Sequence, residues 1–269
     1  MKKKSIWQKS KEQIRANKGP ATVYFILRIL VIATMILQFF NGNYENVFYC
    51  VLTLILFMLP AILERSLNLD LPNTLEIIIL LFIFAAEVLG EINAFYLKFP
   101  MWDTILHTTN GFLAAAIGFA MVDLLNEKEN FSLKLSPFFM AVVAFCFSMT
   151  IGVLWEFFEF GMDVIFHTDM QKDTVLSAIC SVNLNDTIST SPVELKGISD
   201  IILVTPEGEK SLGLGGYLDI GIYDTMEDLL VNFIGAVVFS VFGFFHIKHR
   251  GKNKLIKGLL PVRRYWDKE

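Results

Sequence analysis

Long apolar runs are the feature of this sequence that most restricts what it can fold into. The first is TVYFILRILVIATMILQFF at residues 22–40, and similar runs recur towards the C-terminus. About 20 apolar residues in a helix cross the roughly 30 Å hydrocarbon layer of a membrane. Hydrophobic residues make up 54% of the chain and charged residues only 19%, which excludes an ordinary soluble domain. We predict an all-α polytopic membrane protein with about six transmembrane helices, at residues 22–40, 46–63, 75–95, 102–124, 137–165 and 226–246.

The distribution of basic residues predicts the orientation of these helices. Lys and Arg cluster in residues 1–20 and in residues 248–269, whereas the acidic residues gather between them. Short basic segments stay in the cytoplasm, so both termini are expected there and the number of spans is expected to be even. The first apolar run lacks a small-residue cleavage site and is interpreted as an anchor. The expected partner is therefore the lipid bilayer, and nucleic acid is not expected to bind.

A hydrophilic stretch, residues 166–223, separates the fifth and sixth predicted spans. The first five spans lie within residues 21–165, and the sixth lies within residues 224–247. This topology puts the stretch outside the cytoplasm. Within it, DIILVTPEGEKSLGLGG at 200–216 has two short β-prone segments around Pro206, Glu207 and Gly208. We predict a small extracytoplasmic insert that contains a β-hairpin, with Cys180 exposed to water.

Polar residues inside the predicted spans follow helical spacing. Residues three, four or seven positions apart share one face of a helix. Such stripes occur in the last four predicted helices, and the topology brings them all to the outer side of the membrane. The members are Glu87 and Glu91; Asp103, His107 and Asn110; Glu156, Glu159 and Asp163; and Asp224, Asp228 and Asn232. The fourth-helix stripe continues as Gly111, Ala114 and Gly118, small residues that let another helix approach closely.

Carboxylates gathered in a partly dry site cannot all be ionised without compensation. Two alternatives remain open: a bound divalent metal ion, or carboxyl groups that keep their protons. A third interpretation takes Glu91 and Asp163 as solvated helix ends and His107 as a packing residue, whereas Glu87 and Glu156 lie too deep for that interpretation to be favoured. The candidate catalytic residues are Asp103, His107, Glu156, Glu159, Asp224, Asp228 and Asn232. The candidate metal ligands are Glu87, Asp103, His107, Glu156 and Asp228.

Three motifs carry a resemblance to a known family. They are DTILHTTNG at 103–111, WEFFE at 155–159 and DIGIYDTMEDLLVNFIGA at 219–236. In this order and spacing they resemble the YjdF-like bacterial inner-membrane proteins, and more distantly the VanZ-type membrane proteins. The resemblance covers about residues 75–240 and implies a multi-pass protein of a bacterial plasma membrane. It also implies that Asp219 belongs with the candidate site residues.

Two functions fit these residues. In the first, the site handles a polar lipid headgroup in the outer leaflet through a bound cation. In the second, the acids serve cation- or proton-coupled transport, with Glu87 as the deepest carboxylate. A non-catalytic membrane scaffold with a polar packing centre is a third alternative.

Overall fold

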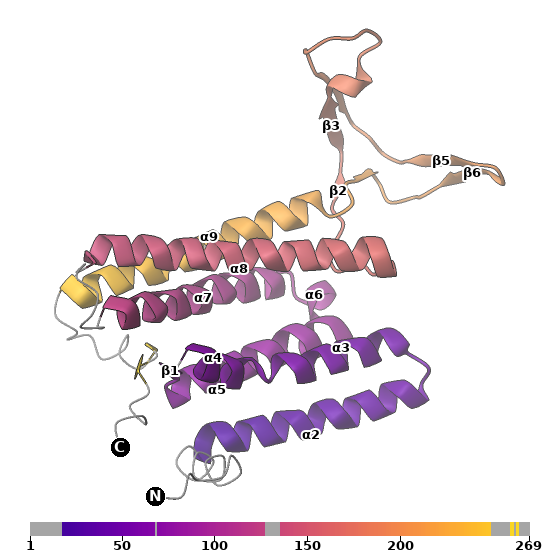
Figure 1. Ribbon diagram of the computed structural model, residues 1–269. Coiled ribbons are helices and arrows are strands. Elements are labelled where there is room, and N and C mark those ends of the chain that lie inside the picture. The colour runs from indigo at the N-terminus through magenta and orange to yellow at the C-terminus, as the bar shows by residue number, and fades with distance from the viewer. Residues whose placement is uncertain (1–17, 68, 127–134, 249–258, 261, 264–269) are drawn as a thin grey trace, which may run out of the picture. The chain divides into compact units, whose positions relative to one another are not determined.

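The computed structural model describes residues 18–67, 69–126, 135–248, 259–260 and 262–263 (Figure 1). Most of the predicted basic segments, residues 1–20 and 248–269, lies outside the described residues. Among the described residues, five helical segments are long and apolar enough to cross a membrane, and they confirm the predicted polytopic all-α fold. These segments are Lys18–Phe40, Tyr44–Ser66, Trp102–Asn126, Pro137–Phe166 and Ile222–Lys248. The chain forms two compact units: Met1–Gly152 with Val231–Glu269 (unit 1), and Val153–Leu230 (unit 2).

Unit 1 begins with two antiparallel segments joined by a tight turn (Figure 1). Helix α2 (Lys18–Phe40) ends at a turn where Gly42 has a φ of +73°, and α3 (Tyr44–Leu56) then returns alongside it. The predicted span 46–63 is divided, because α4 (Leu59–Leu67) starts a separate helix after a short turn. Pro60 accounts for the division, because it has no N–H to donate to the carbonyl of Leu56 and is tolerated in the first turn of a helix, where it stands in α4.

The third predicted span is also a composite. It consists of α5 (Asn73–Phe84) followed directly by the π-helix η1 (Ala85–Ile92). Asn73 is the first residue of α5 and does not cap it, because Pro72 occupies the cap position and the helix start has no side-chain cap hydrogen bond. A short helix, α6 (Phe95–Lys98), then leads into the next long helix.

Three long helices complete the helical part of the chain: α7 (Trp102–Asn126), α8 (Pro137–Phe166) and α9 (Ile222–Lys248). At about 1.5 Å per residue, the 30 residues of α8 extend roughly 45 Å, more than a bilayer core requires. In unit 1 a short antiparallel pair joins β1 (Leu69–Asp70) to β8 (Val262–Arg263).

The interior of unit 1 has two apolar clusters. The first joins α2, α3, α5, η1 and α7, and the second joins α7 to the unit 1 portions of α8 and α9. Small residues on α7 make the second cluster compact: a Cβ on Gly118 would stand 2.8 Å from the Cβ of Phe147. The predicted close approach of a helix to the small-residue face of α7 is thereby confirmed.

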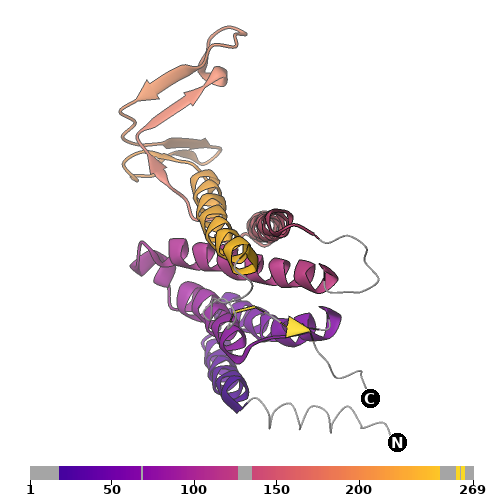
Figure 2. The same ribbon diagram turned by 90° about the vertical axis from the view of Figure 1, so that its left-hand side faces the viewer.

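Unit 2 contains the end of α8, the start of α9 and the insert between them. Figure 2 shows the insert as separate antiparallel strand pairs. The hairpin predicted around Pro206 is present as β5 (Ile202–Thr205) and β6 (Gly208–Ser211), with Val204 opposite Glu209. Two further pairs join β2 (Val175–Leu176) to β7 (Tyr217–Leu218), and β3 (Ala178–Ser181) to β4 (Val193–Lys196), with the 3-10 helix η2 (Val182–Leu184) after β3.

Candidate functional site

Three buried carboxylates meet in unit 2. Glu156 and Glu159 lie on α8, three residues apart, and Asp228 lies in the second turn of α9. One carboxylate oxygen from each lies within 4.8 Å of the others, and the side chains are 4%, 8% and 3% exposed. The segments 153–166 and 222–230 contain no Lys, Arg or His residue. The site is therefore built from hard oxygen donors, and no cationic side chain lies on these two segments.

Trp155 orients one of these carboxylates. Its indole Nε1–H donates a hydrogen bond of 2.8 Å to Oε1 of Glu159, one helical turn away. The remaining carboxylate oxygen of Glu159 then has a restricted set of directions in which to bind a ligand. The sequence prediction did not include Trp155, although its position four residues before Glu159 was the available signal.

Other acids of unit 2 have a structural role. Asp163 accepts hydrogen bonds from the backbone N–H groups of Met170 and Gln171, at 2.7 and 2.9 Å. Asp224, a predicted catalytic residue, accepts one from the backbone N–H of Lys172 at 2.7 Å. These bonds hold the segment after α8 against the start of α9.

Asp219 forms two more hydrogen bonds of this kind, and we call Asp163, Asp219 and Asp224 together the clamp. Its two carboxylate oxygens accept hydrogen bonds from the backbone N–H groups of Thr174, at 2.7 Å, and of Tyr223, at 2.8 Å. Charge-assisted bonds of this kind are stronger than neutral ones. The Asp residues at the ends of α8 and α9 thus fix the entry to the insert, and a catalytic role for Asp224 stays a prediction.

Asp173 lies among these acids and outside the membrane-spanning helices. Loss of hydration raises the pKa of its carboxyl group, and the negative charges of Asp169, Asp219 and Asp163 raise it further, while Lys172 opposes them. The surface of unit 2 beside the clamp is therefore a region of concentrated negative charge.

The predicted stripe on α7 lies in unit 1. His107 is 8% exposed, and its Nε2 is 3.5 Å from Oδ1 of Asp103, one turn earlier. Asn110 donates a hydrogen bond of 3.1 Å from Nδ2 to Oδ1 of Asn232 on α9. Asn232, a predicted catalytic residue, is 1% exposed and acts as a polar packing centre in unit 1. Whether Asp103 and His107 share a site with the unit 2 carboxylates stays a prediction.

Glu87 lies in the π-helix η1 of unit 1 and is 2% exposed. Within the described part of the chain, its Oε2 atom is buried and has no hydrogen-bond partner. Segments of π-helix are frequent at functional sites because they interrupt the regular backbone bonding of a helix. Glu87 is thus a buried carboxyl group in an irregular helix segment, which keeps it a candidate site residue.

Comparisons with known proteins place these features in one family. The family model described as "Predicted membrane protein (DUF2238)" matches residues 23–249. A protein from Thermotoga maritima, described as an uncharacterized protein, is 28% identical over 106 residues. That match covers 39% of this chain and 53% of the relative, so it spans about half the length of the relative. No solved structure matches the chain.

Proposed function

Because the chain belongs to the family of predicted membrane proteins DUF2238, we propose that it is an integral membrane protein that holds a divalent cation and uses it to bind a polar lipid headgroup. The proposed ligands are Glu156, Glu159 and Asp228. The observation that carries the proposal is the approach of their carboxylate oxygens to within 4.8 Å of one another in a buried setting.

The donor chemistry supports a cation. Buried carboxylates must be neutralised by protons, by positive groups or by a metal ion. Carboxylate oxygens suit Mg²⁺, Mn²⁺ or Ca²⁺. A cation held here would supply positive charge for a phosphate group of a lipid. In this proposal Trp155 positions Glu159, and the acids of the clamp keep the ends of α8 and α9 in register.

The finer placement follows the sequence prediction. We propose that both termini are cytoplasmic, that the insert lies outside, and that the carboxylates therefore face the outer leaflet of a bacterial plasma membrane. Membership of a YjdF-like group is consistent with the family match, and the more distant likeness to VanZ-type proteins stays a prediction. Asp103 and His107 are proposed as acid and base groups of the same function.

Glu87 supports a second candidate function, cation- or proton-coupled transport. A carboxyl group buried at membrane depth is expensive and commonly marks an ion or proton pathway. In this alternative Glu87 exchanges a proton during transport. Proton uptake by vesicles containing the protein, lost in Glu87→Gln, would favour this candidate over lipid binding.

Metal analysis of the detergent-purified protein tests the principal proposal. After incubation with Mn²⁺ and removal of free ions, we expect about one Mn²⁺ per chain, lost in Glu156→Gln and in Asp228→Asn. Glu207→Gln removes an exposed carboxylate from the hairpin turn of the same unit and should keep the metal. His107→Ala reports separately whether α7 contributes a ligand.

A folded wild-type protein that retains no Mn²⁺, Mg²⁺ or Ca²⁺ would contradict the cation site. Retention of the metal by both Glu156→Gln and Asp228→Asn would contradict the assignment of its ligands. Lipid binding is measured as the fraction of a spin-labelled phospholipid that the protein immobilises. We expect EDTA to reduce this fraction for the wild type and to leave it unchanged for Glu156→Gln.

A further inference from the structure

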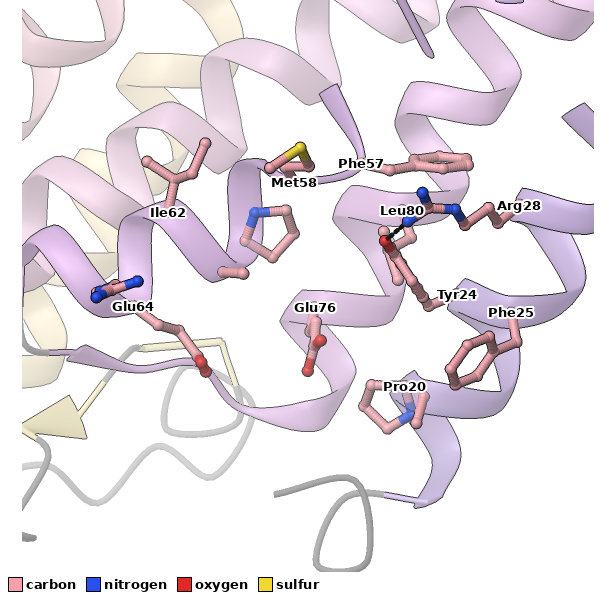
Figure 3. A pocket seen from close by; sticks show the side chains of 14 residues that line it. Pro20, Tyr24, Phe25, Arg28, Phe57, Met58, Ile62, Glu64, Glu76 and Leu80 are labelled. Atoms are coloured by element: carbon pink, nitrogen blue, oxygen red, sulfur yellow. Dashed lines mark hydrogen bonds between the residues drawn. The ribbon is translucent and has the colours of Figure 1, made fainter. Parts of the chain in front are cut away.

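A cavity of about 580 Å³ lies in unit 1, formed by α2, α4 and α5 together with the turn before α4 (Figure 3). Several of its lining residues stand at helix ends. Pro20 is in the first turn of α2, Arg65 in the last turn of α4 and Glu76 in the first turn of α5. Because a short connection joins α4 to α5, the predicted topology puts their adjoining ends on one face of the membrane. We therefore expect the cavity to open near the lipid headgroups of that face.

Charges of both signs line this cavity. Arg28 and Arg65 supply guanidinium groups, and Glu64 and Glu76 supply carboxylates. Figure 3 shows Arg28 reaching in from α2, where its Nη1 donates a hydrogen bond to the hydroxyl group of Tyr24. The carboxylate of Glu64 accepts a hydrogen bond from the backbone N–H of Leu71 at 3.1 Å.

Three of these ionisable side chains have no ion-pair partner among the residues that the structure describes. Between described residues, neither Arg28 nor Arg65 forms an ion pair, and the side chain of Glu76 forms no hydrogen bond or ion pair. Charged groups of both signs line this cavity and do not pair with one another. They are therefore suited to a ligand that carries both a positive and a negative group. A purely anionic ligand would meet repulsion from the carboxylates.

The rim of the cavity is apolar and faces outward. Phe25, Met58 and Ile62 line the cavity and are 51%, 53% and 49% exposed. In a membrane-spanning protein such side chains contact lipid chains. A ligand that satisfies both the rim and the charged interior has a polar head and an apolar tail.

We propose that this cavity binds an aminophospholipid, with the phosphate on Arg28 and Arg65 and the primary ammonium group on Glu76 and Glu64. Arginine is suited to the phosphate because its planar group can donate two parallel hydrogen bonds to it. The volume lies within the range of roughly 300–1,000 Å³ found for small-molecule sites, which accommodates the headgroup and the first part of the tails. The site is separate from the proposed cation site, and its test does not depend on a metal.

Native mass spectrometry of the delipidated full-length protein measures this binding. Phosphatidylethanolamine and phosphatidylglycerol with identical acyl chains are added in equal amounts. We expect phosphatidylethanolamine to bind at least several-fold more tightly to the wild type. Arg28→Gln should weaken the binding of both lipids by about tenfold, as expected for the loss of a charged hydrogen-bond donor.

Glu76→Gln tests the recognition of the ammonium group separately from that of the phosphate group. It should remove the preference for phosphatidylethanolamine while leaving phosphatidylglycerol binding at least as strong. Lys98→Gln is the matched control, since it removes a cation of unit 1 outside the cavity and should keep both affinities. The ratio of the two lipids on each variant is an internal measure that partial unfolding does not mimic.

Two results would overturn the proposal. One is a wild type that binds phosphatidylglycerol as tightly as phosphatidylethanolamine or more tightly. The other is wild-type phosphatidylethanolamine occupancy in a folded protein that carries both Arg28→Gln and Arg65→Gln. Persistence of the preference in Glu76→Gln would likewise contradict the assignment of the ammonium group.

Discussion

Gly111 in α7 lies against the main chain of Asn232 in α9: a Cβ at position 111 would stand 2.1 Å from the Asn232 carbonyl oxygen. The contact is reciprocal, because a Cβ on Gly235 would stand 2.0 Å from the carbonyl oxygen of Thr108. Ser148 adds a hydrogen bond of 2.7 Å from Oγ to the Gly111 carbonyl. Glycines at this crossing let two backbones meet and hold Asn110 within reach of Asn232.

Gly111→Ala should therefore destabilise the protein. The added methyl group meets backbone atoms that cannot rotate away, and overpacking of this kind costs about 1–3 kcal/mol. Gly161→Ala is the control, because a Cβ there meets nothing within 4 Å and alanine favours a helix over glycine. Thermal unfolding in detergent measures both. Equal stability of Gly111→Ala and the wild type would show that the crossing is looser than these distances indicate.

Trp155→Phe should weaken cation binding without removing it. The substitution deletes the Nε1–H that donates to Glu159 and keeps an aromatic ring at the same place. Loss of a group that orients a metal ligand commonly lowers affinity about 10- to 100-fold. Titration with Mn²⁺ followed by calorimetry gives the affinity of each variant.

Trp102→Phe serves as the control for this prediction. Its Nε1–H donates to the backbone carbonyl of Ala85 at 3.3 Å, in unit 1, so the affinity for Mn²⁺ should not change. An unchanged affinity in Trp155→Phe would indicate that Glu159 is not a ligand.

The sequence predicts much of this fold because apolar run length and helical spacing are local properties. The bounds of α8 follow from Pro137 and the run after it, and the stripe of Glu156 and Glu159 follows from their spacing. Their approach to Asp228 depends on which helices meet. The sequence prediction grouped these residues, and the structure brings Glu156, Glu159 and Asp228 together, whereas their depth in the membrane stays a prediction.

Other features depend on contacts that spacing does not contain. The division of the second span needed the effect of Pro60 on its neighbours, and the π-helix that carries Glu87 has no distinct sequence period. The sequence predicts Asp219 and Asp224 as site residues because it does not reveal the backbone N–H groups from which they accept hydrogen bonds. The cavity could not be predicted, because Arg28 and Glu76 are about fifty residues apart in the sequence and no spacing pattern links α2 to α5.

Asp173 predicts a pH dependence of stability. Its pKa is raised in the folded protein, so the folded state holds this proton more tightly than the unfolded chain. Its contribution to stability is therefore fully present in acid and is lost as the pH rises through the folded pKa. Asp173→Asn should stabilise the protein at pH 7, by less than about 1 kcal/mol because the group is exposed to water.

The same substitution should give no gain near pH 3, where Asp173 is already protonated in both states. Asp186→Asn, at another exposed position of the insert, is compared at both pH values. Chemical denaturation of each variant supplies the free energies. A gain from Asp173→Asn that is equally large in acid would show that repulsion among the acids is not its cause.

Cys180 tests the side of the membrane on which the insert lies. It is exposed on β3, whereas Cys50 is buried. In a Cys146→Ser background, a maleimide that cannot cross membranes should label Cys180 in intact cells, because residues 166–223 are predicted outside. Labelling that appears only after the cells are permeabilised would place the insert in the cytoplasm. Since Glu156, Glu159 and Asp228 lie on the helix segments that flank the insert, that result would also move the proposed cation site to the inner leaflet.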